Sequence, residues 1–267
     1  MNLIYATIIS IFALTTTTPT PPPPTPTPTP VPQVAVFASV DAPDDDALQA
    51  AAEVVEARLE ALEVDYVSVS TSSETDAERA ILVEIDAENL TPRVIELLTQ
   101  PGYLELVDAS NLELNADTVG ALIWTTGQEQ RLTALAVSPA EPEIPEGALL
   151  DPDTDQAFET VLDGTAVTSA EVLLDDNSGL WLIEVTLSDE GAAVIEAFSA
   201  GHVGDALAIV VDGAILSLPV LQSEISSPLW LQGNYTEAEV RELAAQLGSG
   251  PLPVSLEFAE LRSASDE

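Results

Sequence analysis

The stretch "DALAIVVDGAILSLPVLQSEI", Asp205 to Ile225, decides the fold of this sequence. Two apolar runs flank Asp212-Gly213, and Asp-Gly is a strong signal for a two-residue hairpin turn because both central positions need positive φ. The pattern predicts two antiparallel strands, with Pro219 late in the second strand marking an edge or a bulge. Asp212 is then better explained as a turn residue than as a buried acid.

The charge of the chain limits what it can bind. Its 267 residues include 46 acidic and 6 basic side chains, which gives a formal net charge of −40. Such a charge repels phosphate backbones and anionic lipid, so we expect no nucleic-acid partner and no polybasic membrane attachment. Hydrophobic residues still make up 46% of the chain, which is enough to fill a core. The acidic side chains are most simply explained as part of a solvated surface. Without cysteine, disulfides and a thiol nucleophile are excluded.

The N-terminus predicts export. "LIYATIISIFAL", Leu3 to Leu14, matches the apolar core of a signal peptide and is shorter than the ~20 residues of a membrane-spanning helix. Residues 1–14 are therefore interpreted as a signal peptide, with a short N-terminal anchor as the alternative. Residues 15–33 form a Thr/Pro-rich linker, which proline should hold extended. We expect an exported protein, periplasmic or at the cell surface, that touches a membrane only through the N-terminal segment if that segment is uncleaved.

Residues 34–108 show the element order β-α-β-β-α-β. Asp44 to Asp46 cap the first helix, and Thr91 followed by Pro92 caps the second. Alternating or apolar runs at 33–40, 66–70, 79–86 and 103–108 predict the strands. The order predicts an α+β protein whose base is a ferredoxin-like α/β sandwich, with the helices on one face of an antiparallel sheet.

Residues 109–160 are less regular and are predicted as a connector. "GALIWTT" (120–126) and "RLTALAVS" (131–138) have the pattern of strands. Asp151, Asp153 and Asp155 resemble the start of a calcium loop, but Gln156 replaces the required Gly and Leu162 the bidentate Glu. A solvated turn is favoured there, with weak calcium binding as the alternative.

Residues 161–228 predict an α+β head subdomain inserted into the base. Two strands surround "DDNSG", a helix follows with Ser188 or Asp189 as its cap, and the Asp212-Gly213 hairpin comes next. Residues 229–260 are predicted to return to the base through a helix capped by Asn234, and residues 261–267 to form a C-terminal tail. Trp181 and Trp230 are expected to be buried on strands.

Three blocks carry a family resemblance. "DGTAVTSAEVLLDDNSGLWLIEVTLSDEG", "VGDALAIVVDGAILSLPVLQSEI" and "LQGNYTEAEVRELAAQLGSGPLPVSLEF" resemble the large periplasmic domain of SecD, the accessory subunit of the bacterial Sec protein-export machinery. The resemblance spans most of residues 34–258 and implies a base with an inserted head that can swing. The motif residues it identifies, mainly structural, are Gly164, Val167, Thr168, Gly191, Gly204, Asp212, Gly213, Pro219, Gly233, Asn234, Gly250 and Pro251.

The resemblance implies an exported module that binds extended or translocating polypeptide as an accessory to protein export, with Sec translocon components as further partners. SecD proper continues into membrane helices that couple proton flow to head motion. Because no apolar run of spanning length follows residue 14, we do not expect this chain by itself to be proton-driven. The alternative is a stalked surface module for one specific folded protein. Strand addition at a sheet edge would serve either function.

The parts of an active site are missing from the sequence. His202 is the sole histidine and is expected to contact the end of a helix. Gly248-Ser249-Gly250 lacks the frame of a nucleophile elbow, and there is no P-loop or dinucleotide fingerprint. We therefore expect no enzymatic activity, no cofactor and no catalytic metal.

Overall fold

The computed structural model describes residues 33–40, 44–73, 79–112, 118–135, 143–176 and 178–263. The described residues all belong to one compact unit of the chain. The predicted signal peptide or anchor (1–14) and residues 15–32 of the predicted linker lie outside them. Gln33, which was grouped with the linker, is the first residue of a strand.

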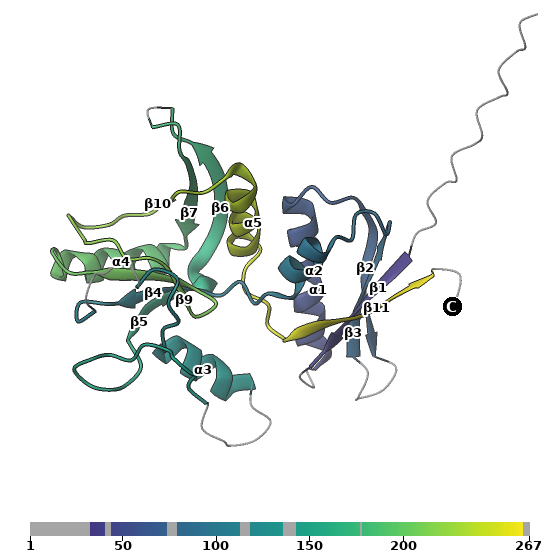
Figure 1. The fold of residues 1–267 in the computed structure, drawn as a ribbon, viewed down its shortest axis with the longest axis horizontal. Coiled ribbons are helices and arrows are strands. Elements are labelled where there is room, and N and C mark those ends of the chain that lie inside the picture. The colour runs from purple at the N-terminus through teal and green to yellow at the C-terminus, as the bar shows by residue number, and fades with distance from the viewer. Residues whose placement is uncertain are drawn as a thin grey trace, which may run out of the picture. The chain divides into compact units, whose positions relative to one another are not determined.

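One antiparallel sheet has the order β11-β1-β3-β2. Its strands are β1 (Gln33–Ser39), β2 (Tyr66–Ser73), β3 (Arg79–Ile85) and β11 (Leu256–Ser263). Helices α1 (Asp45–Ala61) and α2 (Pro92–Thr99) cover one face of it (Figure 1). Both helices begin as predicted, since Asp44 accepts a hydrogen bond from the Ala47 N–H and Thr91 accepts one from the Val94 N–H.

The prediction that residues 104–108 complete this base is wrong. They form β4 (Leu104–Asp108), a central strand of a second sheet with the order β5-β4-β8-β9. Its partners are β5 (Thr160–Asp163), β8 (Leu207–Val211) and β9 (Ala214–Ser217). Residues 104–107 are all buried, so β4 is covered on both faces, whereas an edge strand of a one-sided sheet leaves much of its length exposed. The strand that completes the base is β11, which includes residues 261–263 of the predicted tail.

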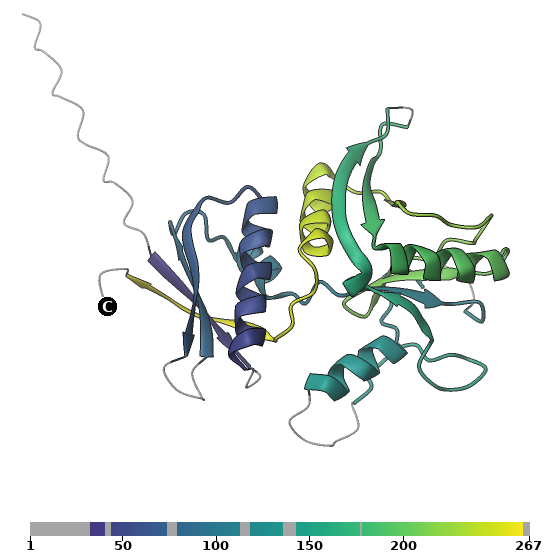
Figure 2. The ribbon, with the colours of Figure 1, turned by 180° about the vertical axis from the view of Figure 1, so that it is seen from behind.

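A third sheet has the order β10-β7-β6 and contains the predicted hairpin around "DDNSG". It comprises β6 (Val167–Leu174), β7 (Trp181–Leu187) and β10 (Leu229–Gln232). Helix α4 (Asp189–Gly201) follows β7 and is capped by Ser188, one of the two predicted candidates. Helix α5 (Glu237–Gly248) lies against the β6–β7 hairpin (Figures 1 and 2).

The predicted return to the base at residue 229 is therefore wrong. Strand β10 pairs with β7, and Val240, Ala244 and Leu247 of α5 join the core between the second and third sheets. The chain enters the core of the base only at Leu252, followed by Val254 and Leu256. The prediction failed because an amphipathic helix packs equally well on any apolar sheet face, and its sequence does not name the sheet.

The hairpin quoted from the sequence forms as predicted. Strands β8 and β9 pair antiparallel, and Asp212 and Gly213 join them with φ of 50° and 82°. Both values are positive, as a primed turn requires. Pro219 lies beyond the end of β9, where its carbonyl accepts the Leu207 N–H at 3.0 Å.

The strands predicted at 120–126 and 131–138 are wrong where the structure describes them. Residues Thr126–Leu135 form helix α3, and Leu122 and Ile123 make only isolated bridges. Thr125 accepts the Gln128 N–H at 3.1 Å, which starts the helix. The β-branched and aromatic residues that suggested strands are present because this segment is buried: Ile123 and Trp124 are each 1% exposed. Residues 136–138 lie outside the described part.

The α+β class is confirmed by these three antiparallel sheets and their helices. The ferredoxin-like arrangement of the base stays a prediction, which the order β1-α1-β2-β3-α2-β11 supports. Across the described ranges, no helix combines the length and apolar character needed to cross a membrane.

Candidate functional site

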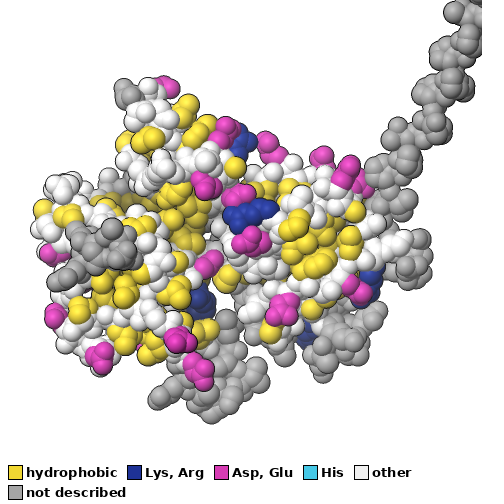
Figure 3. All heavy atoms as spheres, in the orientation of Figure 1, with side chains coloured by type: hydrophobic (Ala, Val, Ile, Leu, Met, Phe, Trp, Pro, Cys, Tyr) yellow, Lys and Arg dark blue, Asp and Glu magenta, His cyan; other side chains and the backbone are white. Residues whose placement is uncertain are grey.

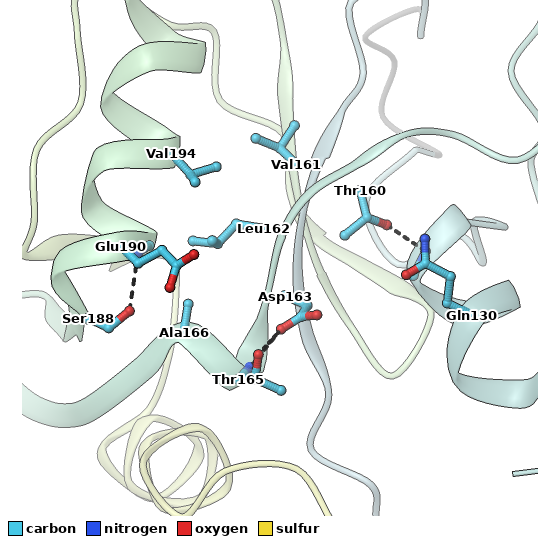
Figure 4. A pocket seen from close by; sticks show the side chains of 12 residues that line it. Gln130, Thr160, Val161, Leu162, Asp163, Thr165, Ala166, Ser188, Glu190 and Val194 are labelled. Atoms are coloured by element: carbon cyan, nitrogen blue, oxygen red, sulfur yellow. Dashed lines mark hydrogen bonds between the residues drawn. The ribbon is translucent and has the colours of Figure 1, made fainter. Parts of the chain in front are cut away.

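The candidate site is a pocket of about 380 Å³ beside β5, an edge strand of the second sheet (Figure 4). Residues 160–163 of β5 and the short 3-10 helix η1 (Gly164–Ala166) form one wall. The first turns of α4 form another, and Gly127 and Gln130 of α3 a third. Both polar and apolar side chains line it, with Asp163 and Glu190 as its acids and Val161, Leu162 and Val194 as its larger apolar groups.

Local capping positions these walls. Asp163 accepts hydrogen bonds from the Thr165 N–H at 2.9 Å and from the Thr165 hydroxyl, and so caps η1. Ser188 accepts the Gly191 N–H at 3.1 Å and caps α4. A Cβ on Gly191 would stand 2.7 Å from the Ala166 Cβ, so only glycine lets the helix start this close to η1.

A buried carboxylate stands behind the pocket. Glu105 of β4 is fully buried, and its Oε1 accepts hydrogen bonds from the Thr125 hydroxyl at 2.7 Å and the Thr160 hydroxyl at 2.8 Å. Thr160 Oγ1 also accepts the Gly127 N–H at 2.9 Å. Glu105 Oε2 has no hydrogen-bond partner among the described residues. The polar network therefore reaches from the pocket wall to the centre of the sheet.

Tyr103 lies beside the pocket acid Asp163. Its hydroxyl donates to Asp163 at 3.4 Å, and its ring lies 4.0 Å from the guanidinium carbon of Arg131. Burial raises the pKa of Tyr103 to about 12, with the Asp163 and Glu105 carboxylates adding to the shift and Arg131 opposing it. Tyr103 is thus a neutral hydrogen-bond donor at physiological pH.

The predicted motif residues lie in several places. Gly191 lines the pocket, and Gly164 packs tightly behind it, since a Cβ there would stand 3.2 Å from the Leu104 N. Val167 begins β6, where the register shifts, and Thr168 at that shift donates its hydroxyl to the Thr186 carbonyl at 3.1 Å. These residues shape the pocket and its surroundings, as a mainly structural role implies.

A second group of motif residues lies at the two chain crossings, where the chain passes between the base and the rest of the domain. The first crossing is residues 100–103 and the second is residues 249–252. The Asp212 carboxylate accepts the N–H groups of Gly102 and Tyr103 at 3.1 and 2.8 Å. The Leu252 N–H donates to the Pro101 carbonyl at 2.8 Å and pairs the two crossings. Asp212 is thus more than a turn residue. The remaining motif residues of this group are Gly213 in the same turn and Gly250 and Pro251 in the second crossing.

The other motif residues are further apart. Gly204, with φ of 102°, donates its N–H to the Leu221 carbonyl at 2.9 Å. A Cβ on Gly233 would stand 2.5 Å from the Tyr235 ring. The prediction that Asn234 caps α5 is wrong, because Thr236 is the N-cap and forms a capping box with Glu239. The Thr236 N–H lowers the pKa of Glu239 by donating to its carboxylate.

Sequence reasoning missed Arg58, the basic side chain that donates the most hydrogen bonds at the two crossings. It is fully buried on α1 and donates to the carbonyls of Leu97, Gln100, Pro101 and Gly250 and to the Ser249 hydroxyl. Burial lowers the pKa of Arg58 to about 10, opposed by Asp212, so the group stays charged at neutral pH. The available signal was its spacing, three residues after Val55 on the apolar face of the helix.

The remaining candidates have local roles. Asp151 accepts the N–H groups of Asp153 and Thr154, which makes a turn, and within the described ranges no group of three or more His, Cys, Asp or Glu is placed to hold a metal ion. His202 is the C-cap of α4, with Nδ1 2.7 Å from the Phe198 carbonyl oxygen. Trp181 is half-buried, but the expectation for Trp230 is wrong, because its side chain is 62% exposed.

Comparisons with known proteins agree with this architecture. Residues 148–254 match the family model for the SecDF P1 head subdomain. Protein translocase subunit SecD of Koribacter versatilis is 27% identical over 224 residues, which are 82% of this chain and 39% of that protein. SecD of Sebaldella termitidis is 39% identical over 105 residues, which are 39% of this chain and 26% of that protein. The chain thus spans well under half the length of these relatives.

Solved structures of SecDF are also similar. One, described as a membrane component that enhances protein export, superposes with a TM-score of 0.60 at 25% identity, over 86% of this chain and 99% of that chain. A crystal structure of SecDF in a super-membrane-facing form gives a TM-score of 0.61 at 26% identity, over 86% of this chain and 30% of that chain. Over most of its length the chain is therefore similar to the SecD-type periplasmic domain, and residues 148–254 match the model of its head subdomain.

Proposed function

We propose that this chain is an extracytoplasmic accessory of protein export that binds extended polypeptide in the pocket beside β5. The observation that carries the proposal is the position of this pocket, along an edge strand of the part that matches a SecDF head. Edge strands recognise extended chains through backbone hydrogen bonds, largely independent of sequence, which suits a protein that meets many substrates.

The pocket offers the complementary chemistry. Its apolar groups, Leu162 and Val194, can contact aliphatic side chains, and Asp163 and Glu190 can accept hydrogen bonds from polar ones. In this proposal the domain holds polypeptide without chemical change and without proton drive of its own. Sec translocon components are its further partners, because the related proteins are translocase subunits.

The test is a binding titration of the whole chain with a reduced, unfolded polypeptide and with the same polypeptide folded, at low and high salt. We expect preferential, salt-tolerant binding of the unfolded form. Failure of the unfolded polypeptide to bind at any salt concentration would refute the proposal. Tight binding of one folded protein alone would favour the alternative, a stalked interaction module.

A pair of variants locates the site. Val194→Trp should fill the pocket and weaken binding of the unfolded polypeptide by about tenfold or more. Val203→Trp is the matched control, because Val203 is 56% exposed and lies outside the pocket. Equal affinity of both variants and the wild type would exclude the pocket as the binding site.

A further inference from the structure

The third sheet has one face toward the core and one face open. Along β7, Ile183, Val185 and Leu187 belong to the core shared with α4 and α5. Alternation places Leu182 and Glu184 on the opposite face. The strand register sets Glu171, Glu184 and Trp230 in one row across this face, with Leu173 and Leu182 paired in the next row. We call these five residues the Trp230 face.

The aromatic residue of this face is held in place yet exposed. Trp230 is 62% exposed, and its indole N–H donates to Glu184 Oε2 at 2.8 Å. Leu173 is 37% exposed, while Leu182 between the two is only 7% exposed. A large, oriented aromatic next to an aliphatic pair is the composition of an energetic centre of a protein interface.

The charges of the face lack internal compensation. Glu171 and Glu184 stand directly opposite each other on the same side of neighbouring strands, an arrangement that destabilises a sheet. No arginine forms an ion pair with either among the described residues. Arg58 donates to backbone carbonyls at the chain crossings, Arg131 lies over the Tyr103 ring, and the other four arginines pair with acids elsewhere. Figure 3 likewise shows acidic side chains spread over the visible surface and few basic ones.

We propose that the Trp230 face docks a basic segment of another polypeptide. A guanidinium or ammonium group of that segment lies over the Trp230 indole and against the Glu171 and Glu184 carboxylates, and an aliphatic neighbour contacts Leu173. The opposed carboxylates favour this occupant over an acidic or purely apolar one. The face shares no residue with the pocket beside β5, so the two proposals stand separately.

The experiment titrates the whole chain with a blocked peptide of about twelve alternating Arg and Leu residues, and with its counterpart carrying Glu in place of Arg. Tryptophan fluorescence follows binding. We expect the basic peptide to change the fluorescence, the acidic peptide to leave it unchanged, and the change to be lost in Trp230→Ala. Glu171→Gln combined with Glu184→Gln should weaken binding by about tenfold.

The matched control is Glu53→Gln combined with Glu88→Gln, which removes the same charge from exposed positions of the base. Equal weakening by the two pairs would show a response to net charge alone and would overturn the proposal, as would an equal fluorescence change with the acidic peptide. If the double variant misfolds, Glu171→Gln alone replaces it in the test, because Glu171 is at an exposed position.

Discussion

The Asp212 carboxylate accepts the Tyr103 N–H at 2.8 Å, and the Asp212 N–H donates back to the Tyr103 carbonyl at 3.0 Å. This reciprocal pair joins the β8–β9 turn to the first chain crossing, 109 residues away in sequence. Arg58 holds the same crossing from the side of α1. The turn and the base are thus connected through one short segment of backbone.

Asp212→Ala should lower the free energy of unfolding by roughly 2 kcal/mol, because two part-buried N–H groups lose a charged acceptor. Asp212→Asn should cost about half as much, since asparagine tolerates positive φ and keeps one acceptor oxygen. Urea unfolding of the three proteins checks the order. An equal loss for both variants would show that the carboxylate charge accounts for the whole effect and that the turn conformation adds nothing to it.

Gly102→Ala should be strongly destabilising, by roughly 3 kcal/mol. Gly102 has φ of 71°, and a Cβ there would stand 2.6 Å from Arg58 Nη2. Gly120→Ala is the control, because Gly120 has φ of 86° with no atom near the new Cβ, and should cost only about 1 kcal/mol of backbone strain. If the two losses measured by urea unfolding were equal, the contact with Arg58 would not be limiting.

The raised pKa of Tyr103 predicts that the free energy of unfolding falls at high pH. Its pKa is raised to about 12 in the folded protein, while an unfolded tyrosine ionises near pH 10. Its contribution is therefore fully present below pH ~10 and is lost as the pH rises from there toward 12. Tyr103→Phe should flatten this part of the pH profile of the unfolding free energy, and the difference between the two proteins isolates Tyr103 from other titrating groups. Identical slopes in both would contradict the assignment.

The cap of α5 can be tested directly. Thr236→Ala should cost about 1 kcal/mol, because it removes the acceptor of the Glu239 N–H and half of the capping box. Asn234→Ala should change stability by less than about 0.5 kcal/mol, since Asn234 is an exposed residue outside the helix. A larger loss for Asn234→Ala in thermal unfolding would favour the cap predicted from the sequence.

Local signals in the sequence were sufficient for many features that depend on neighbours along the chain. Asp44, Thr91 and Ser188 cap their helices as predicted, and Asp212-Gly213 forms the predicted turn. Each of these features is stabilised by groups within a few residues, so its pattern can be read in a short window. The capping signal failed at Asn234, because the N-cap is Thr236, two residues further along the chain.

The candidate site could be predicted only in part. Gly191 was named as a structural motif residue and does line the pocket. Glu105, Thr160 and Asp163 were missed, because an acid inside a strand of unknown sheet position looks like any other acid in a chain that has 46 of them. Their roles follow from the pairing of β4 with β5, which brings residues 55 or more positions apart into one network.

The sequence by itself determined the element types outside residues 120–138, most helix ends, the central hairpin and the family resemblance, because these depend on local periodicity and on ordered motifs. Only the tertiary structure decided that β4 belongs with β8 while β11 completes the base, that α5 packs on the β6–β7 hairpin, and that Arg58 is buried at the crossings. The physical reason is that strand pairing and helix packing use backbone groups and apolar faces common to many segments. Which segments meet is settled by the burial of the whole chain.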